Sequence, residues 1–314
     1  MKAIICKKFA PVSDLVWEEV ADPVAGPGEV VVDIKAAGLN YPDNLIVQGL
    51  YQFQPERPFS PGHEGAGVVS SVGEGVDMHS VGDSVAFFKG FGAFAEKIVL
   101  PAQMAFPIPE SFPFHIAAGV FMVYGTSYHA LVQRADINKD DEVLVLGAAG
   151  GVGLAAVDIA KSFGARVVAA VSTKEKAEVC AGYGVDDVVV YGEEKLNKEG
   201  QKAFTKELKS KSVRGGFSII YDPIGDCFAE PALRSIGWGG TYLVVGFAAG
   251  SGITPIMSII KTALLDHPEN SFYLVYGNKT PEDTMFYNEL KDLENTFSGR
   301  LSIQWVFSLS LIHI

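Results

Sequence analysis

Cysteine is scarce in this chain. Its three cysteines, Cys6, Cys180 and Cys227, lie far apart in 314 residues, and no Cys-x-x-Cys spacing occurs. This spacing excludes a disulfide framework and a cysteine-rich metal site. We therefore expect a protein of the reducing cytoplasm.

Positive charge and long apolar runs are also in short supply. Lys and Arg number 25 against 37 Asp and Glu, which gives a formal net charge of −12. Nucleic acid and anionic lipid are bound by clustered Lys and Arg, so neither is an expected partner. No apolar run is long enough to span a membrane, and MKAIICKKFAP at the N-terminus is too short for a signal segment. The 48% hydrophobic content predicts a soluble chain with a large core and about two domains.

The pattern of elements changes along the chain. Up to about Pro109, short apolar runs such as EVVVDIKAAG and GAFAEKIVL are separated by Gly and Pro, which is typical of a compact β domain. From DEVLVLGA onward, apolar strands alternate with helical segments, as in RVVAAVS, KEKAEVCAGYG and DVVVY. This alternation predicts the α/β class, with a parallel sheet and crossover helices on its faces.

A glycine-rich turn joins the first of these strands to its helix. The segment VLVLGAAGGVGLAAVDIAKSFGA places Gly147, Gly150, Gly151 and Gly153 between the two elements. Small residues at this place let the backbone approach a pyrophosphate, whose charge meets the helix N-terminus. We interpret the segment as a dinucleotide-binding turn.

The end of the next strand indicates which dinucleotide is bound. An NAD-preferring site has Asp or Glu there, whereas VVAAVSTKEK supplies Ser172, Thr173, Lys174 and Lys176. An acid would repel a 2′-phosphate, and a hydroxyl with a lysine attracts one. NADPH is therefore the expected cofactor. One of the two lysines, which we take to be Lys174, is expected to be an ordinary surface residue.

Several segments occur in an order that resembles one family. They are AAGLNYPDNLIVQGLYQFQPERPFSPGHEGAGVVSSVGEGV, VYGTSYHAL, the glycine-turn segment, YDPIGD and GWGGTYLVVGFAAG. Over about residues 1–250 the chain resembles the zinc-independent NADPH:quinone oxidoreductases of the medium-chain dehydrogenase/reductase superfamily. The resemblance implies a GroES-like β domain over 1–120 and a Rossmann doubly wound parallel sheet over 121–250, with NADPH in the cleft between them.

The same resemblance implies the site residues. At the substrate end, with catalytic roles, it puts Asn40, Asp43, Tyr51 and Tyr124. Thr126 and Phe247 would lie against the nicotinamide, and Tyr191 near the adenosine phosphate. The residues implied for the pyrophosphate turn and the 2′-phosphate are Gly147, Gly150, Gly151, Val152, Gly153, Ser172 and Lys176.

The segment PGHEGAGVV resembles the His-Glu element of the zinc alcohol dehydrogenases. A catalytic zinc needs three protein ligands, but Asn40 stands at the place of the first cysteine and Met122 falls near that of the distal ligand. His63 is then alone, and no metal is expected. The implied reaction is hydride transfer to a quinone or conjugated enone, with Asn40, Tyr51, Tyr124 or water as donor to its oxygen. The alternatives are a zinc-dependent alcohol dehydrogenase and a non-catalytic NADPH-binding protein.

A second glycine-rich turn, GFAAGSGITP, predicts a discontinuity. Over about residues 251–308 the chain resembles part of the NADP-binding module of ferredoxin reductase-type oxygenase reductases, with GSGITP as the pyrophosphate loop and YGNK as a second nucleotide-contacting element. The last six residues, LSLIHI at 309–314, resemble a translated sequencing adapter. We interpret the chain as chimeric, with the C-terminal return of the β domain missing. The family is usually homodimeric, and the strand that pairs its dimers is expected to be missing too.

Overall fold

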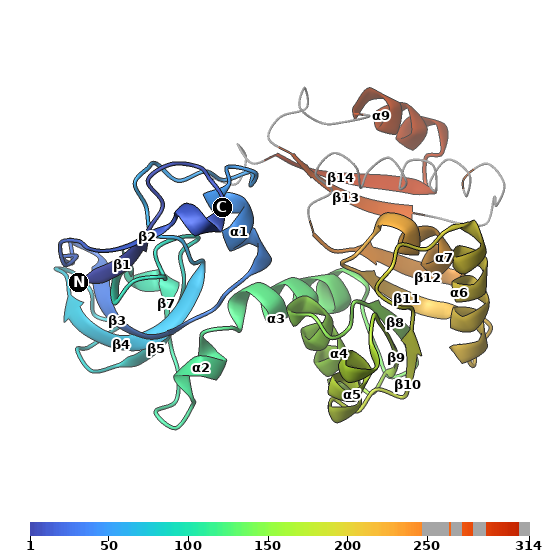
Figure 1. The fold of residues 1–314 in the computed structure, drawn as a ribbon, viewed down its shortest axis with the longest axis horizontal. Helices are drawn as coiled ribbons and strands as arrows, with labels where there is room; N and C mark the ends of the chain where they lie inside the picture. Colours follow the sequence, from blue (N-terminus) through green and yellow to red (C-terminus); the bar gives the residue numbers. More distant parts are fainter. Residues whose placement is uncertain (247–263, 265–271, 279–286, 308–314) are drawn as a thin grey trace. The chain divides into compact units, whose positions relative to one another are not determined.

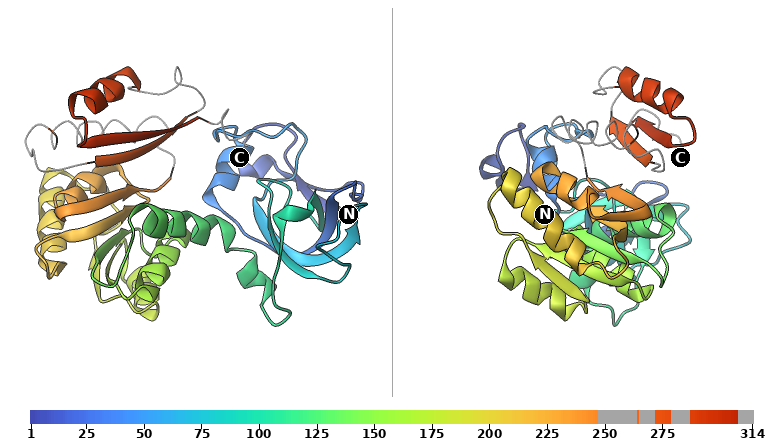
Figure 2. Two further views of the ribbon diagram at one scale, coloured as in Figure 1. Left: turned by 180° about the vertical axis from the view of Figure 1, so that it is seen from behind. Right: turned by 90° about the vertical axis from the view of Figure 1, so that its right-hand side faces the viewer.

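The computed structural model describes residues 1–246, 264, 272–278 and 287–307 (Figure 1). The chain divides into two compact units, Met1–Gly125 and Thr126–Ile314. Figure 2 shows the ribbon from behind and from one side.

The first unit is built on a five-stranded antiparallel sheet with the strand order β6-β3-β4-β5-β7 (Figure 1). Its strands are β3 (Glu29–Ala37), β4 (Glu64–Val72), β5 (Ser84–Phe88), β6 (Lys97–Pro101) and β7 (Ala105–Pro107). A separate antiparallel pair is formed by β1 (Lys2–Ile5) and β2 (Val16–Glu19). The short apolar runs between Gly and Pro punctuation thus form strands, as the sequence predicts.

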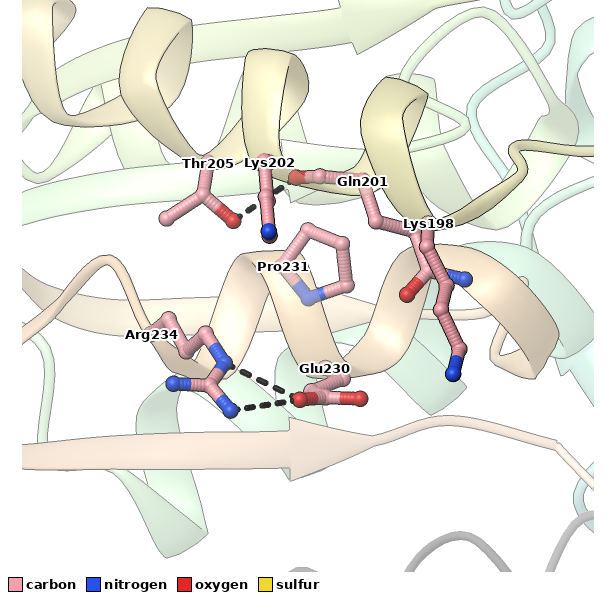
Figure 3. Close-up of a pocket in the computed structure, with 7 residues that line it drawn as sticks. All are labelled: Lys198, Gln201, Lys202, Thr205, Glu230, Pro231 and Arg234. Atoms are coloured by element: carbon pink, nitrogen blue, oxygen red, sulfur yellow. Dashed lines mark hydrogen bonds and ion pairs between the residues drawn. The ribbon is translucent and has the colours of Figure 1, made fainter.

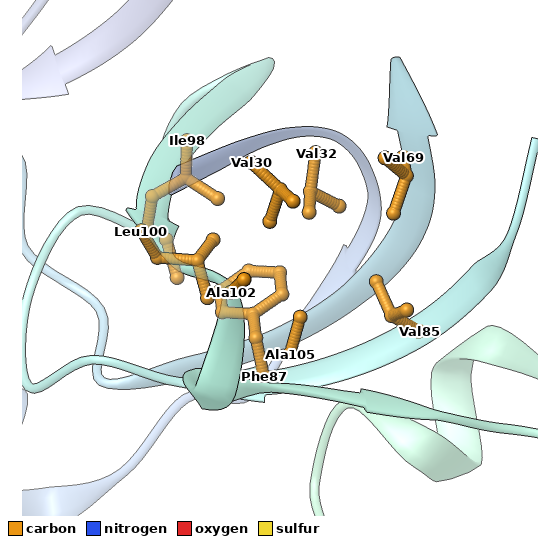
Figure 4. Close-up of a cluster of buried hydrophobic side chains, with 10 residues drawn as sticks. Val30, Val32, Val69, Val85, Phe87, Ile98, Leu100, Ala102 and Ala105 are labelled. Carbon is orange, nitrogen blue, oxygen red and sulfur yellow. The ribbon is translucent and has the colours of Figure 1, made fainter. Parts of the chain in front are cut away.

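One hydrophobic cluster holds this sheet together (Figure 4). Alternate side chains of a strand point to the same face, so Val30 and Val32 of β3 lie on one side of the sheet. They pack with Val69 of β4 and Phe87 of β5, all of them fully buried. Burial of this apolar surface is the main term that stabilises the unit.

Short helices complete the first unit. They are η1 (Val12–Asp14), α1 (Tyr41–Val47), η2 (Ala102–Met104), α2 (Phe114–Ala117) and the first part of α3 (Phe121–Tyr128). Helix α1 begins after Asn40, whose backbone is extended, with Pro42 in its first turn, a place where the missing N–H of proline costs nothing. The Asp43 side chain accepts the Asn40 backbone N–H at 2.8 Å, which caps the helix.

The second unit contains a five-stranded parallel sheet with the strand order β10-β9-β8-β11-β12 (Figure 1). Its strands are β8 (Glu142–Leu146), β9 (Arg166–Val171), β10 (Asp187–Val190), β11 (Phe217–Asp222) and β12 (Ile236–Val244). The strand order reverses between β8 and β11, which makes the sheet doubly wound. The expected α/β class and the Rossmann-type parallel sheet are confirmed.

Helices connect these strands. They are η3 (His129–Arg134, a π-helical turn), α4 (Gly151–Ser162), α5 (Lys174–Gly182), α6 (Lys198–Lys211), η4 (Asp226–Phe228) and α7 (Ala229–Leu233). Right-handed crossovers put α4 and α5 on one face of the sheet, and α6 and α7 on the other (Figure 1). Because β8 is covered on both faces, every residue of its EVLVL sequence is buried.

Beyond β12 the described residues form a further strand–helix–strand segment. It comprises β13 (Phe272–Asn278), α9 (Tyr287–Thr296) and β14 (Leu301–Phe307). The two strands pair in parallel with each other, as a sheet separate from the five-stranded one. The GSGITP loop and the tail 309–314 lie outside the described residues. None of the helices that the structure describes is both long and apolar enough to cross a membrane.

Candidate cofactor and substrate sites

The glycine turn after β8 has the geometry that its sequence predicts. Gly147 has φ of 57°, a left-handed conformation that glycine adopts without steric cost. The Gly150 N–H donates to the Gly147 carbonyl oxygen at 2.9 Å, which closes the turn, and α4 starts at Gly151. The chain thus passes from the buried strand to the helix within a few residues.

Gly153 lets α4 pack directly on this turn. A Cβ at this position would meet the carbonyl oxygen of Gly147 and would lie 2.8 Å from Cα of Ala148. Gly150 and Gly151 are exposed. The backbone N–H groups in the first turn of α4 have no partner within the helix, so they are donors for an anion. The turn therefore has a geometry that could receive a pyrophosphate.

Ser172 and Lys176 meet at the end of β9. The Lys176 Nζ donates to Ser172 Oγ at 2.7 Å, and the Lys176 N–H donates to Thr173 Oγ1, which caps α5. Lys174 is exposed on the same helix. The hydroxyl and the ammonium group can together receive a phosphate next to the ribose that binds at this strand end.

Ser127, the residue after Thr126, is buried and is held in place by two hydrogen bonds. Ser127 Oγ donates to the carbonyl oxygen of Val152 at 2.9 Å, so it accepts from the Tyr221 hydroxyl at 2.8 Å. Burial raises the pKa of Tyr221 to about 12, with the Ser127 hydrogen bond acting in the other direction. The phenol therefore stays protonated, and Thr126, which is exposed, is held beside the glycine turn.

Tyr191 follows β10 and belongs to an aromatic cluster. Its ring centroid lies 4.5 Å from that of Phe228 and 5.7 Å from that of Phe204. Burial, and to a smaller extent the charge of Asp222, raises the pKa of Tyr191. The half-buried ring stands at the carboxyl end of its strand, on the same edge of the sheet as the glycine turn and Ser172.

In the first unit, the centre of the substrate-end group is a buried pair. His63 Nδ1 and Asp43 Oδ1 are 2.5 Å apart, and the side chains are 4% and 3% exposed. The second oxygen of Asp43 accepts the Asn40 N–H. Asp43 therefore joins the start of α1 to the residue before β4, and both of its oxygens are used.

Glu64, the residue after His63, makes a second buried link. Its Oε1 accepts from Asn40 Nδ2 at 2.7 Å, and its Oε2 accepts from the Met122 N–H at 3.0 Å. Burial raises the pKa of Glu64, and the hydrogen bonds from Asn40, Met122 and Phe121 oppose that effect. The side chain is 1% exposed. It connects Asn40 to the first turn of α3, the helix that carries Tyr124.

Of the two tyrosines predicted for the substrate end, Tyr51 contacts this group and Tyr124 lies on α3. The Tyr51 ring meets the His63 ring edge-on, with centroids 5.9 Å apart. Burial, and secondly the charge of Asp43, raises the pKa of Tyr51. Tyr124 is half-buried on α3. Asn40, Asp43 and Tyr51 are thus gathered around His63 and Glu64.

The sequence-predicted cofactor residues of the second unit also gather, at the carboxyl ends of β8, β9 and β10. Phe247 lies outside the described residues. Two buried residues escaped the sequence reasoning, Glu64 and Ser127. An acid that opens the apolar run EGAGVV is a signal for Glu64, because a buried carboxylate needs partners.

Two other features of the described residues bear on the site. No group of three or more His, Cys, Asp and Glu side chains in this part of the chain could hold a metal ion. A surface groove between α6 and α7 contains none of the predicted site residues (Figure 3). It is lined by Lys198, Gln201, Lys202, Thr205, Glu230, Pro231 and Arg234.

Comparison with protein families agrees with this arrangement. The GroES-like domain of alcohol dehydrogenases matches residues 26–110, and the zinc-binding dehydrogenase family matches residues 151–287. A GroES-like domain followed by a Rossmann-type domain defines a medium-chain dehydrogenase/reductase. Quinone oxidoreductase-like protein 2 of Bos taurus is 37% identical over 279 residues, which cover 88% of this chain and 75% of that protein. The chain belongs to the quinone oxidoreductase-like proteins of this superfamily.

Solved structures give the same result. The quinone oxidoreductase of Escherichia coli complexed with NADPH is 27% identical, with a TM-score of 0.72 over 95% of this chain and 87% of that one. A 2-haloacrylate reductase is 28% identical, with a TM-score of 0.63 over 80% of this chain and 74% of that one. The quinone oxidoreductase-type family and the expected GroES-like and Rossmann-type folds are confirmed, and the chain is an oxidoreductase of the quinone oxidoreductase type.

Proposed function

We propose that this chain reduces quinones or conjugated enones with NADPH and without zinc, in the cytoplasm. The observation that carries the proposal is the Ser172–Lys176 pair at the end of β9, on the sheet edge that also has the glycine turn. Two similar proteins support it: one is named a quinone oxidoreductase and was solved with NADPH, and the other is named a 2-haloacrylate reductase.

The residues of the second unit are assigned to the cofactor. Gly151, Val152 and Gly153 offer backbone N–H groups to the pyrophosphate, while Gly150, whose own N–H closes the turn, and the left-handed Gly147 let the backbone approach it. Ser172 and Lys176 hold the 2′-phosphate. When bound, NADPH supplies the hydride from C4 of its nicotinamide. The further residues assigned to the cofactor are Thr126, Tyr191 and Phe247.

The residues of the first unit are assigned to the acceptor. Asn40 donates an amide N–H to the acceptor oxygen, where negative charge develops as the hydride arrives. The raised pKa of Tyr51 keeps its phenol protonated, so it is a second donor. Asp43 positions Asn40 by accepting its backbone N–H, and Tyr124 is carried by α3, two residues after Met122, whose N–H donates to Glu64.

Zinc independence is supported by the small number of candidate ligands. No group of three or more His, Cys, Asp and Glu side chains in the described part of the chain could hold a metal ion, and the Asn40 amide at the place of a cysteine ligand contacts Glu64. We expect elemental analysis of the purified protein to find substoichiometric zinc, and a chelator to leave NADPH oxidation unchanged. Stoichiometric zinc together with loss of activity on chelation would establish the alternative, a zinc-dependent alcohol dehydrogenase.

The cofactor preference can be tested with one charge reversal. Lys176→Glu places a negative charge beside Ser172, so we expect the Kd of NADPH to rise by about 10–100-fold, since a charge-assisted hydrogen bond contributes about 1.5–3 kcal/mol. The Kd of NADH should stay within about twofold, because it lacks the phosphate. Titration of cofactor fluorescence measures both constants.

Lys174→Glu is the matched control, because it makes the same charge change on the same helix at an exposed lysine. It should weaken NADPH binding by less than about threefold, because it is the equally exposed Lys176, and not Lys174, that donates to Ser172. A charge that makes no direct contact with the phosphate is screened by solvent. An equal loss in both variants would contradict the assignment of Lys176. Tight NADPH binding without reduction of any quinone or enone would identify a non-catalytic NADPH-binding protein.

We also propose that residues 251–308 come from a second gene, that of a ferredoxin reductase-type module, and that 309–314 are translated adapter. The separate parallel pair β13–β14 supports this, because β13 extends its own sheet and not the five-stranded one. The family match to residue 287 runs past the proposed join and counts against it. Sequencing single molecules of source DNA should give a different continuation after Gly250. One uninterrupted read from Gly240 to Ser308 would overturn the proposal.

A further inference from the structure

The Asn40 side chain has a defined orientation, and Glu64 imposes it. Oε1 of Glu64 is 2.7 Å from Asn40 Nδ2. A carboxylate accepts hydrogen bonds only, so the nitrogen of the amide, and not its oxygen, must face it. One Nδ2 hydrogen is used in this contact. Among the described residues, no other hydrogen bond takes the second one.

The surroundings of Glu64 leave the carboxylate little freedom. A Cβ on Gly38 would lie 2.7 Å from Glu64 Oε1 and 2.8 Å from its Cγ, so the carboxylate fits only because position 38 has no side chain. The Gly38 N–H donates to the Glu64 carbonyl oxygen. With Met122 N–H on Oε2, each oxygen of the carboxylate has a fixed donor.

We propose that Glu64 is a positioning residue for the reaction: its carboxylate turns the Asn40 amide so that one N–H remains for the acceptor oxygen, and ties that amide to the start of α3. This inference rests on the proposed role of Asn40 as donor. The carboxylate touches neither acceptor nor cofactor in this assignment. It acts by disfavouring the other orientation of the Asn40 side-chain amide, in which the amide oxygen would face the developing negative charge.

Glu64→Gln tests the proposal, because glutamine has one acceptor oxygen and cannot accept from both Asn40 and Met122. We expect kcat for NADPH oxidation with a quinone to fall by about 100-fold, the size of effect seen when an oxyanion donor is lost. The KM for NADPH should stay within about twofold, because the proposed cofactor contacts are elsewhere. Glu96→Gln is the control, as Glu96 is an exposed carboxylate that also accepts one backbone N–H, from Lys2, and it should leave kcat unchanged.

A double variant separates positioning from stability. Glu64→Gln combined with Asn40→Asp exchanges donor and acceptor, so the contact can form again in reverse. We expect the Tm to recover towards that of the wild type, while kcat stays about 100-fold low because the aspartate offers no N–H. Recovery of kcat together with Tm would show that Glu64 only stabilises the fold, and would overturn the proposal.

A measurement without turnover distinguishes failure of this inference from failure of the proposed function. In the wild type, one side-chain N–H of Asn40 should exchange with solvent more slowly than the other in an NMR spectrum, and Glu64→Gln should remove the difference. An Asn40 signal that is unchanged in the variant would overturn the inference whatever the activity. If this difference is lost but the wild type reduces no quinone or enone, the orientation stands and the donor role fails.

Discussion

Replacing Gly153 with alanine should weaken NADPH binding by at least about tenfold and lower the free energy of unfolding by about 1–3 kcal/mol. The added Cβ would meet the carbonyl oxygen of Gly147 and the backbone of Ala148, at 2.8 and 2.9 Å from its Cα and C atoms. These are backbone atoms of the turn, which cannot rotate away as a side chain does. Helix α4 must therefore move off β8, and its first N–H groups move with it.

Gly182→Ala is the control for this variant. Gly182 ends α5, and a Cβ there meets no atom within 4 Å. Alanine restricts the unfolded chain, so the control should be neutral or more stable by about 0.4–1 kcal/mol. Denaturant unfolding and cofactor titration measure both variants. Wild-type NADPH affinity in Gly153→Ala would contradict the close packing of helix and turn.

The largest loss of stability is expected from Asp43→Ala. Both oxygens of Asp43 are used, by His63 Nδ1 and by the Asn40 N–H. Without the carboxylate, the buried His63 side chain and the partly buried Asn40 N–H lose their partner, which costs about 2–5 kcal/mol of unfolding free energy. Activity should fall as well, because α1 loses the cap that holds Asn40.

Asp43→Asn and Asp77→Ala refine this prediction. The asparagine keeps one acceptor oxygen and should cost less than alanine, about 1–3 kcal/mol. Asp77 is an exposed carboxylate of the same unit, and its replacement should stay within about 0.5 kcal/mol. If Asp43→Ala unfolds at the same denaturant concentration as the wild type, the pair does not stabilise this unit.

The parts of the site that were predictable from sequence are local. The glycine turn lies between one strand and the next helix, and Ser172 and Lys176 are only four residues apart, at the end of β9 and the start of α5. For these, spacing alone determines which groups meet. The fold class was predictable for a similar reason, because apolar strands that alternate with helices leave few arrangements other than a parallel sheet.

The contacts around Asn40 were not predictable in this way. Asn40 and Glu64 are 24 residues apart, and Glu64 and Met122 are 58 apart. The first separation is closed by the pairing of β3 with β4, and the second by the packing of α2 on β4, where Ala117 and Ala118 pack in one buried cluster with Ala66. Neither the register of the pairing nor this packing could be predicted from the sequence. The sequence pointed to His63 as a candidate zinc ligand. It gave no role to Glu64, the next residue, which links Asn40 to α3.

The adjacency of His63 and Glu64 has a consequence for how this region can change in evolution. The two neighbours have different partners. His63 contacts Asp43, and Glu64 accepts hydrogen bonds from Asn40 and Met122. Adjacent residues of a strand point to opposite faces, so inserting or deleting one residue here would exchange the two sides. A substitution at His63 or at Glu64 can be compensated by a second substitution at its own partner. A change of length alters both sets of contacts at once and cannot be compensated in this way. We therefore expect insertions and deletions to lie outside the segment from Phe59 to Glu64, which backbone hydrogen bonds also join to Cys6 and Phe94.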